Sequence, residues 1–190
     1  MNPEASDEIR RELGPGETLL WADRPRQGIC LRPADALLIP FSLIWGGFVM
    51  FWESMVLQNH APPMFALFGI PFVLVGIYLV VGRFFVDSYQ RSRTSYGLTN
   101  RRAIIVNGLF NRTVRSIDLS GHDQITLSER GDRSGTITFG PLYPMYPMWA
   151  GTAWPGMGRF QPPAFDLIDD VRNVYDQVRK AQDGVLKGGT

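Results

Sequence analysis

Two long apolar runs, separated by a short polar connection, most constrain how this chain of 190 residues can fold. Residues 36–57 form the first run, which contains a single charged side chain, Glu53. Residues 64–82 form the second run and carry no charge. As a helix with a rise of about 1.5 Å per residue, the second run is roughly 28 Å long, close to the hydrocarbon thickness of a bilayer. The runs therefore predict a two-helix transmembrane hairpin over residues 35–84.

Two other interpretations of the runs are disfavoured. Buried core helices of a soluble protein seldom include two runs this long and this apolar. A cleavable signal peptide does not begin near residue 36 and is not followed at once by a second apolar run. Glu53 is expected near the far interface, since a carboxylate in mid-bilayer costs about 2.5–3.5 kcal/mol. The runs are therefore interpreted as an anchor, whose small residues Ser42, Gly46, Gly47, Gly69 and Gly76 allow close helix packing.

The arginines around the hairpin orient it. The connection, residues 58–63, has neither lysine nor arginine, whereas arginines flank both runs. The excess of positive charge on cytoplasmic loops predicts that both termini are cytoplasmic and that the connection is on the other side. The flanking arginines are Arg10, Arg11, Arg24, Arg26 and Arg32 before the hairpin, and Arg83, Arg91, Arg93, Arg101 and Arg102 after it.

Composition excludes several classes of function. The formal net charge is +1, so the chain lacks the global basic field that suits nucleic acid. The single cysteine, Cys30, excludes an internal disulfide framework and a cysteine-cluster metal site. This cysteine usage suits a domain on the reducing side of a membrane. We expect no metal, no cofactor and no nucleic-acid partner.

Short elements are predicted on both sides of the hairpin. In the cytoplasmic arm, residues 1–34, a helix is expected over residues 6–13 with Ser6 as its N-cap. Residues 17–23 form either a strand or an interfacial segment. A helix over residues 83–93 leaves the bilayer. Alternating polar and apolar residues then predict five strands of an antiparallel meander in a sandwich or barrel, over residues 94–99, 102–106, 113–119, 124–128 and 135–139.

The C-terminal part of the chain predicts a helix. Asp166, Asp169 and Asp170 suit the positive end of a helix dipole, so the helix is expected to begin at Asp166. Its apolar residues at helical spacing are Leu167, Val171, Val174 and Val178. Gly184 is the expected stop, and residues 184–190 are expected to form a flexible tail.

A segment rich in proline, aromatic residues and methionine lies at residues 140–163. Its prolines oppose a regular element, and its apolar side chains oppose a solvated linker. Three interpretations remain open: the segment returns to the membrane interface, docks a membrane-protein partner, or covers an open sheet edge. The candidate partner-docking residues are Tyr143, Met145, Tyr146, Met148, Trp149, Trp154 and Met157.

Residues 94–105 read TSYGLTNRRAII, which resembles the first-hairpin pattern T-x-Y-x-L-T-x-x-R of bacterial pleckstrin-homology-like (PH-like) domains. Residues 16–21, GETLLW, and the following Arg24 and Pro25 resemble the segment that precedes the hairpin in membrane-anchored, two-span members of this family. The resemblance implies the bacterial inner (cytoplasmic) membrane and no established catalytic activity.

The fold class implied by this resemblance is a membrane α-helical hairpin plus an α+β cytoplasmic domain over residues 85–183. That domain would be a bent, seven-stranded antiparallel β-barrel, capped by the C-terminal helix. Residues 140–163 would then be an insertion. A sixth strand is expected near residues 159–165, and the remaining strand comes either from the insertion or from the cytoplasmic arm.

Four arginines close to the second run are candidate contacts for anionic lipid headgroups: Arg91, Arg93, Arg101 and Arg102. The other interpretation is that they only signal topology and carry ordinary hairpin charge. No catalytic residues are predicted, because Ser120, His122 and Asp123 in one turn cannot adopt triad geometry, and His60 has no metal-ligating neighbours in the sequence.

The sequence predicts a non-enzymatic inner-membrane protein that presents a PH-like domain at the cytoplasmic face. Its role would be that of an assembly factor, scaffold or accessory subunit of a membrane complex. The expected partners are membrane lipids and either an integral membrane protein or a second copy of the chain. The alternative is a membrane-surface module that senses anionic lipid by binding it.

Overall fold

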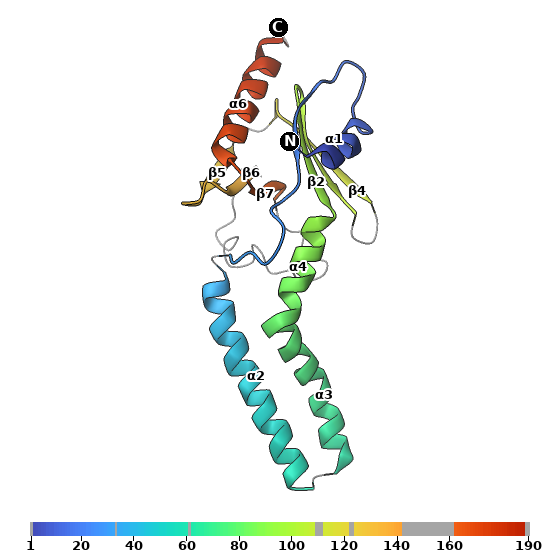
Figure 1. Ribbon diagram of the computed structural model, residues 1–190, viewed down its shortest axis with the longest axis vertical. Coiled ribbons are helices and arrows are strands. Elements are labelled where there is room, and N and C mark those ends of the chain that lie inside the picture. The colour runs from blue at the N-terminus through green and yellow to red at the C-terminus, as the bar shows by residue number, and fades with distance from the viewer. Residues whose placement is uncertain are drawn as a thin grey trace. The chain divides into compact units, whose positions relative to one another are not determined.

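The chain forms two compact units in the computed structural model, which describes residues 2–32, 34–60, 62–108, 112–121, 124–141 and 162–188. The hairpin unit contains residues 29–87. The sheet unit contains the described residues of 1–28, 88–143 and 160–190. Figure 1 shows the elements of both units, which we describe in turn.

The hairpin unit consists of two antiparallel helical arms. Helix α2 is Asp35–Gln58 and α3 is Pro63–Ile77. A π-helical turn, η1, Tyr78–Gly82, follows α3 and leads into α4, Arg83–Ser92. The helical hairpin and its helical continuation beyond residue 82 are thus confirmed.

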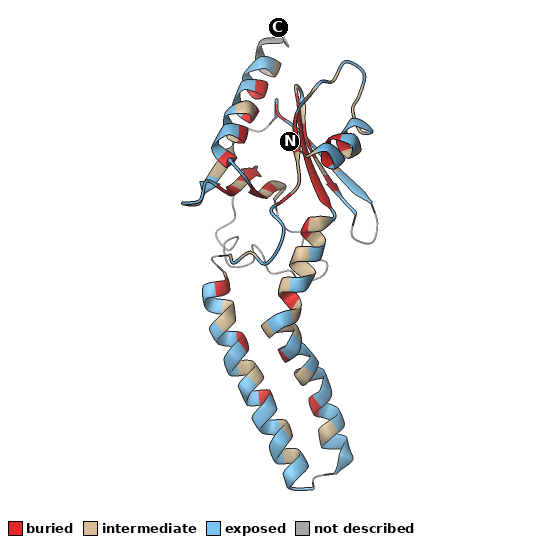
Figure 2. Ribbon diagram, in the orientation of Figure 1, coloured by how far each residue is buried: buried red, intermediate tan, exposed pale blue. Residues whose placement is uncertain are grey.

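The helices of the hairpin expose apolar side chains around most of their circumference (Figure 2). In their most apolar stretches only 17% of α2 and 11% of the second arm is buried within the chain. The core of a soluble protein would cover such helices, so the chain has two candidate membrane-spanning helices. The arms pack closely at Gly76, where a Cβ would lie 3.8 Å from the Cα of Gly46 and 3.7 Å from the Trp45 ring, both ordinary contact distances.

The first sheet contains four antiparallel strands in the order β1-β2-β3-β4. Trp21 pairs with Leu98 and Asp23 with Tyr96, so the sheet joins residues from before and after the hairpin. Residues 17–23 therefore contribute a strand, and the interfacial alternative for this segment is wrong. The strands are β1 Leu19–Asp23, β2 Thr94–Thr99, β3 Arg102–Asn107 and β4 Thr113–Asp118.

The second sheet contains β5 Ile125–Glu129, β6 Gly135–Phe139 and β7 Ala164–Ile168, in that antiparallel order. All five predicted strands after the hairpin are present, and β1 and β7 bring the described strands to seven. These strands form two separate sheets. A closed barrel is not seen in the part of the chain that the structure describes.

The end of the chain corrects three predictions, the first being the expected stop at Gly184 and flexible tail from there, because α6 continues to Gly188. The sixth predicted strand lies at Ala164–Ile168, later than residues 159–165, and the terminal helix α6 begins at Val171, not at Asp166. Asp166 lies within β7, and its carboxylate accepts a hydrogen bond of 2.8 Å from the Thr136 hydroxyl of β6. Pairing with β6 and burial of Phe165 and Ile168 outweigh the preference of the acidic residues for a helix start.

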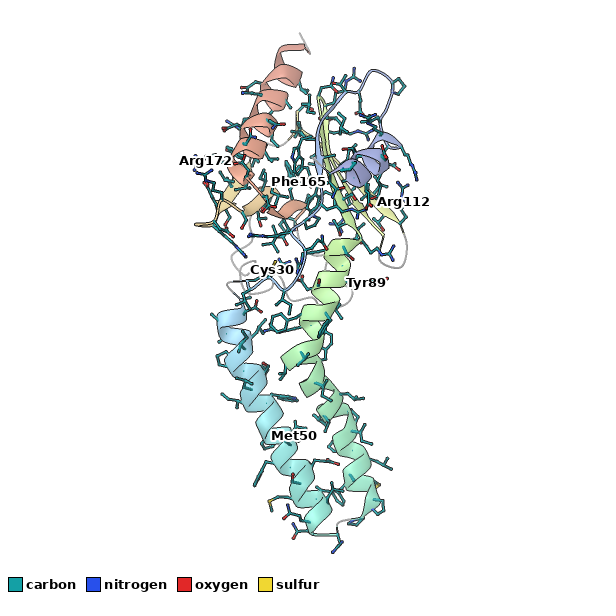
Figure 3. All side chains as sticks on the ribbon, viewed as in Figure 1. Cys30, Met50, Tyr89, Arg112, Phe165 and Arg172 are labelled. Atoms are coloured by element: carbon teal, nitrogen blue, oxygen red, sulfur yellow. The ribbon has the colours of Figure 1, made fainter. Side chains whose placement is uncertain are left out.

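The main core lies between the sheets and α6, Val171–Gly188, around Phe165 (Figure 3). The Phe165 ring centroid is 5.6 Å from that of Trp21, and 5.0 Å from those of both Tyr96 and Phe139. Aromatic pairs at these distances stabilise a core beyond the area that they bury. The side of α6 that faces this core carries Val171, Val174, Val178 and Ala181, which confirms the apolar spacing predicted for the first three.

Helix α1, Pro3–Arg10, covers the opposite face of the first sheet. Gly97 makes this packing close, because a Cβ there would lie 2.5 Å from Cγ2 of Ile9. The buried Ser95 hydroxyl donates a 2.6 Å hydrogen bond to Glu8. The helix starts earlier than predicted: Asn2 is the N-cap, and the Ser6 hydroxyl donates to the Asn2 carbonyl. Residues 1–28 are thus part of the sheet unit.

Candidate functional site

Arg91 joins the exit from the hairpin to the segment that enters it. Its side chain is buried, and its guanidinium donates to the carbonyl oxygens of Arg26 and Gly28, the latter at 2.5 Å. Gln27 adds a hydrogen bond of 3.4 Å to the Arg91 carbonyl. Residues 24–28 and Arg91 are hereafter called the junction. Nη1 and Nη2 of Arg91 thus donate to carbonyl oxygens of the protein, and a lipid headgroup is not the acceptor of these hydrogen bonds.

Arg26 links the junction to the second sheet. Its backbone N–H donates a 2.8 Å hydrogen bond to the Leu167 carbonyl in β7, and its guanidinium pairs with Asp132 in the β5–β6 turn. The Ser134 hydroxyl, at 2.6 Å, and Arg26 hold the pKa of Asp132 well below its ordinary value. The junction therefore fixes the chain on both sides of the hairpin to one sheet unit.

Arg102 makes an equivalent link between residues 12–17, near the start of the chain, and the first sheet. Its Nε and Nη2 each donate a 2.8 Å hydrogen bond to the Glu17 carboxylate, and Nη2 also donates to the Glu12 carbonyl. The backbone N–H of Gly14 is the third donor to Glu17. The hydrogen bonds from Arg102 lower the pKa of Glu17, as does that from Gly14. Two residues of the T-x-Y-x-L-T-x-x-R pattern thus have structural roles: Thr99 accepts the Arg102 N–H in the turn, and Arg102 holds Glu17.

The Glu17 pair predicts a dependence of stability on pH. Because the pKa of Glu17 is lowered in the folded state from about 4.5, its contribution is complete above that value and is lost as pH falls through the lowered pKa. Glu17→Gln is therefore expected to lower the free energy of unfolding by about 1 kcal/mol at pH 7, and by progressively less below pH 4. Pulse proteolysis in urea at several pH values measures this difference. A deficit that is the same at pH 3 and pH 7 would contradict the assignment.

The four predicted lipid contacts do not share one environment. Arg91 is buried in the junction and Arg102 is engaged by Glu17, whereas Arg93 and Arg101 are exposed. The guanidinium of Arg93 lies over the Tyr89 ring, 5.6 Å from its centroid. The predicted partner-docking residues, Tyr143, Met145, Tyr146, Met148, Trp149, Trp154 and Met157, lie outside the described residues.

A second polar cluster, of which only the arginines Arg32 and Arg83 were predicted to act, as topology signals, lies in the hairpin unit. Nη1 of Arg83 is 2.7 Å from Oδ1 of Asp35, and Nη2 of Arg32 is 3.1 Å from Oδ1 of Asp87. We call these four residues the quartet. All four side chains are at most 14% exposed, so both ion pairs are largely removed from solvent. The signal in the sequence is an arginine followed three or four residues later by an aspartate on each side of the hairpin.

Among the described residues, no group of three or more His, Cys, Asp or Glu side chains is placed to hold a metal ion. His122 and Asp123 lie outside the described residues. Glu53 packs on the opposite arm, so closely that a Cβ on Gly69 would be 2.0 Å from its Oε2.

No protein-family model, curated protein or solved structure matches the chain.

Proposed function

We propose that the chain is a non-enzymatic scaffold of the bacterial inner membrane. In this proposal the hairpin spans the bilayer, both termini are cytoplasmic, and the sheet unit is a PH-like binding platform for an integral membrane protein or a second copy of the chain. The binding of such a client would place this protein among assembly factors or accessory subunits of membrane complexes.

The observation that carries this proposal is the pairing of β1 with β2 from opposite ends of the hairpin. A strand that precedes two membrane spans can pair with one that follows them only when both lie on the same side of the bilayer. Positive flanks and a connection without lysine or arginine favour the cytoplasmic side. The junction then supports the same arrangement, because it joins residues 24–28, before the hairpin, to Arg91, after it, within the sheet unit.

The structure also bears on the choice between a protein partner and anionic lipid. Lipid sensing through the surface of the sheet unit would use arginines with donors open to solvent. Arg91 and Arg102 instead donate to protein carbonyls and to Glu17. This leaves Arg93 and Arg101 of the predicted set, which flank opposite ends of β2, whereas electrostatic lipid recognition usually involves four to eight clustered cations. We therefore favour a protein client.

Site-specific photo-crosslinking in intact cells tests the proposal. A photoreactive amino acid at Trp149, in the predicted docking segment, is expected to give a crosslinked product of one defined mass with a membrane protein or with the chain itself. The same group at Arg172, on α6 and 68% exposed at its side chain, serves as the matched control and should give no such product. Crosslinks from Trp149 to lipid alone would instead support the lipid-sensing alternative. A reporter fusion that places either terminus outside the cytoplasm would refute the proposed topology.

A further inference from the structure

The outer face of the first sheet already holds a helix. Helix α1 lies against β1, β2 and β3 (Figure 1). Ile9 is fully buried there, and it sits over the backbone of Gly97, where a Cβ would come within 2.5 Å of its Cγ2. Ala22, Ile104 and Val106 are also fully buried beneath the helix. We call the surface formed by residues 22, 97, 104 and 106 the α1 face.

Charged and polar side chains border the α1 face. Three glutamates at intervals of four residues share one side of α1 and of the turn that follows it. Each of them meets a donor in or beside the first sheet. The pairs are Glu4 with Arg24 at 2.8 Å, Glu8 with the Ser95 hydroxyl at 2.6 Å, and Glu12 with Arg112 at 2.6 Å. An apolar strip bordered by arginines fits a helix that is apolar on one side and acidic beside it.

The contacts that hold α1 in place are few and weak. The helix has eight residues, too few to be stable alone in water, and its buried apolar side chains are Ala5 and Ile9. Glu4 is 73% exposed and Arg112 is 49% exposed, and ion pairs so close to solvent stabilise a fold little. Electrostatic complementarity of this kind contributes more to the choice of partner than to affinity. Detachment of α1 therefore requires much less free energy than unfolding of the sheet unit.

We propose that the α1 face binds an acidic amphipathic helix of the client protein, and that α1 occupies this face until the client displaces it. The client helix carries an isoleucine, or a side chain of similar size, for the space over Gly97, and acidic residues at intervals of four. Docking of the apolar side of a helix on an apolar surface is a recurrent mode of peptide recognition. Residues 11–18 connect α1 to β1 and move aside with it. This inference rests on the proposed protein client, whose binding segment it specifies.

Binding of a fluorescent peptide of residues 2–13 to the full chain in detergent, followed by anisotropy, tests the face. Wild type should bind the peptide weakly, because its own α1 competes. Ile9→Ala weakens the docking of α1, so we expect this variant to bind the peptide at least about tenfold more tightly. Gly97→Val in the Ile9→Ala background is the matched control, because its side chain fills the space that Ile9 of the peptide needs. Equal affinities of these two variants would overturn the proposal.

Hydrogen exchange of wild type tests displacement without any substitution in the protein. Excess peptide, labelled with carbon-13 so that its fragments are distinguishable, should remove the protection of the α1 amides and leave that of β2 and β3. A peptide with glutamine at positions 4, 8 and 12 should bind Ile9→Ala at least about fivefold more weakly at low salt. Continued protection of α1 would overturn the proposal, as would an unchanged affinity of the glutamine peptide.

Photo-crosslinking in cells from Ser116 identifies the occupant, because this exposed residue of β4 accepts a 3.0 Å hydrogen bond from Arg102 beside the α1 face. In Ile9→Ala it should give a product with another protein, which the added Gly97→Val removes. A product of twice the mass of the chain would assign the face to a second copy and overturn the client helix. A protein crosslinked from Trp149 without any peptide binding refutes this inference alone. Peptide binding without any protein crosslinked from either position refutes the proposed client instead.

Discussion

Phe165→Ala is expected to lower the free energy of unfolding of the sheet unit by about 3–5 kcal/mol. Phe165 is fully buried, and its ring contacts aromatic rings from β1, β2 and β6. Truncation to alanine removes these contacts and leaves a cavity where both sheets and α6 meet. Such a loss is a large fraction of the stability of an ordinary domain, so the variant should be cleaved rapidly by protease.

Pulse proteolysis in urea, on the full chain in detergent, measures the unfolded fraction of Phe165→Ala. Val114→Ala is the matched control, because Val114 lies in β4 with 38% exposure and makes no comparable core contacts. The free energy of unfolding of Val114→Ala should stay within about 0.5 kcal/mol of that of wild type. If Phe165→Ala were as stable as this control, Phe165 would not be the centre of the core.

Gly135→Ala is expected to destabilise the sheet unit by about 3 kcal/mol, at the upper end of the usual cost of overpacking. A Cβ at this position would lie 2.2 Å from the Ser128 carbonyl oxygen and 2.8 Å from Cγ1 of Val171. The Ser128 carbonyl oxygen belongs to the backbone of β5. The clash with it can be relieved only if the hydrogen-bonded pairing of β5 with β6 opens. Movement of Val171 alone, at the start of α6, does not remove the clash.

Gly131→Ala separates this steric effect from the general effect of removing a glycine. A Cβ at Gly131, in the turn between β5 and β6, meets no atom within 4 Å. We expect this variant to match wild type or to be slightly more stable, since alanine restricts the unfolded chain. Comparison of the urea midpoints of the two variants gives the steric cost directly. Equal midpoints would show that β5 and α6 do not approach Gly135 closely.

The sequence predicts the hairpin and most strands well because each depends on a local pattern. A run of 19 uncharged residues gives the second arm, and alternation gives β2 to β6. The position of β7 could not be read in this way. Residues 166–170 contain three aspartates, which favour a helix start locally, but Phe165 and Ile168 gain more by pairing with β6 and entering the core. That gain comes from residues distant in the chain.

The candidate sites were less predictable for a related reason. Arginines near a membrane span look alike in the sequence, whether they face lipid, carbonyl groups or carboxylates. The structure places Arg91 on the carbonyls of residues 26 and 28 and pairs Arg83 with Asp35, partners 48 or more positions away. Such partners are set by the return of the chain through the hairpin. Near Arg83 the only signal is the spacing from arginine to aspartate on each side of the hairpin, and near Arg91 no pattern in the sequence indicates its partners.

The pairing of β1 with β2 has a consequence for biosynthesis. The ribosome releases β1 first, and its partner follows only after both arms of the hairpin have been made, some 70 residues later. Until then the ring of Trp21 has no core to enter. In the proposed topology, a nascent chain that inserted only one arm would have β1 and β2 on opposite sides of the bilayer, and the first sheet could not form. A completed sheet would then exclude insertion of one arm alone, and chains with a single inserted arm would keep an unpaired strand for proteases and chaperones to find.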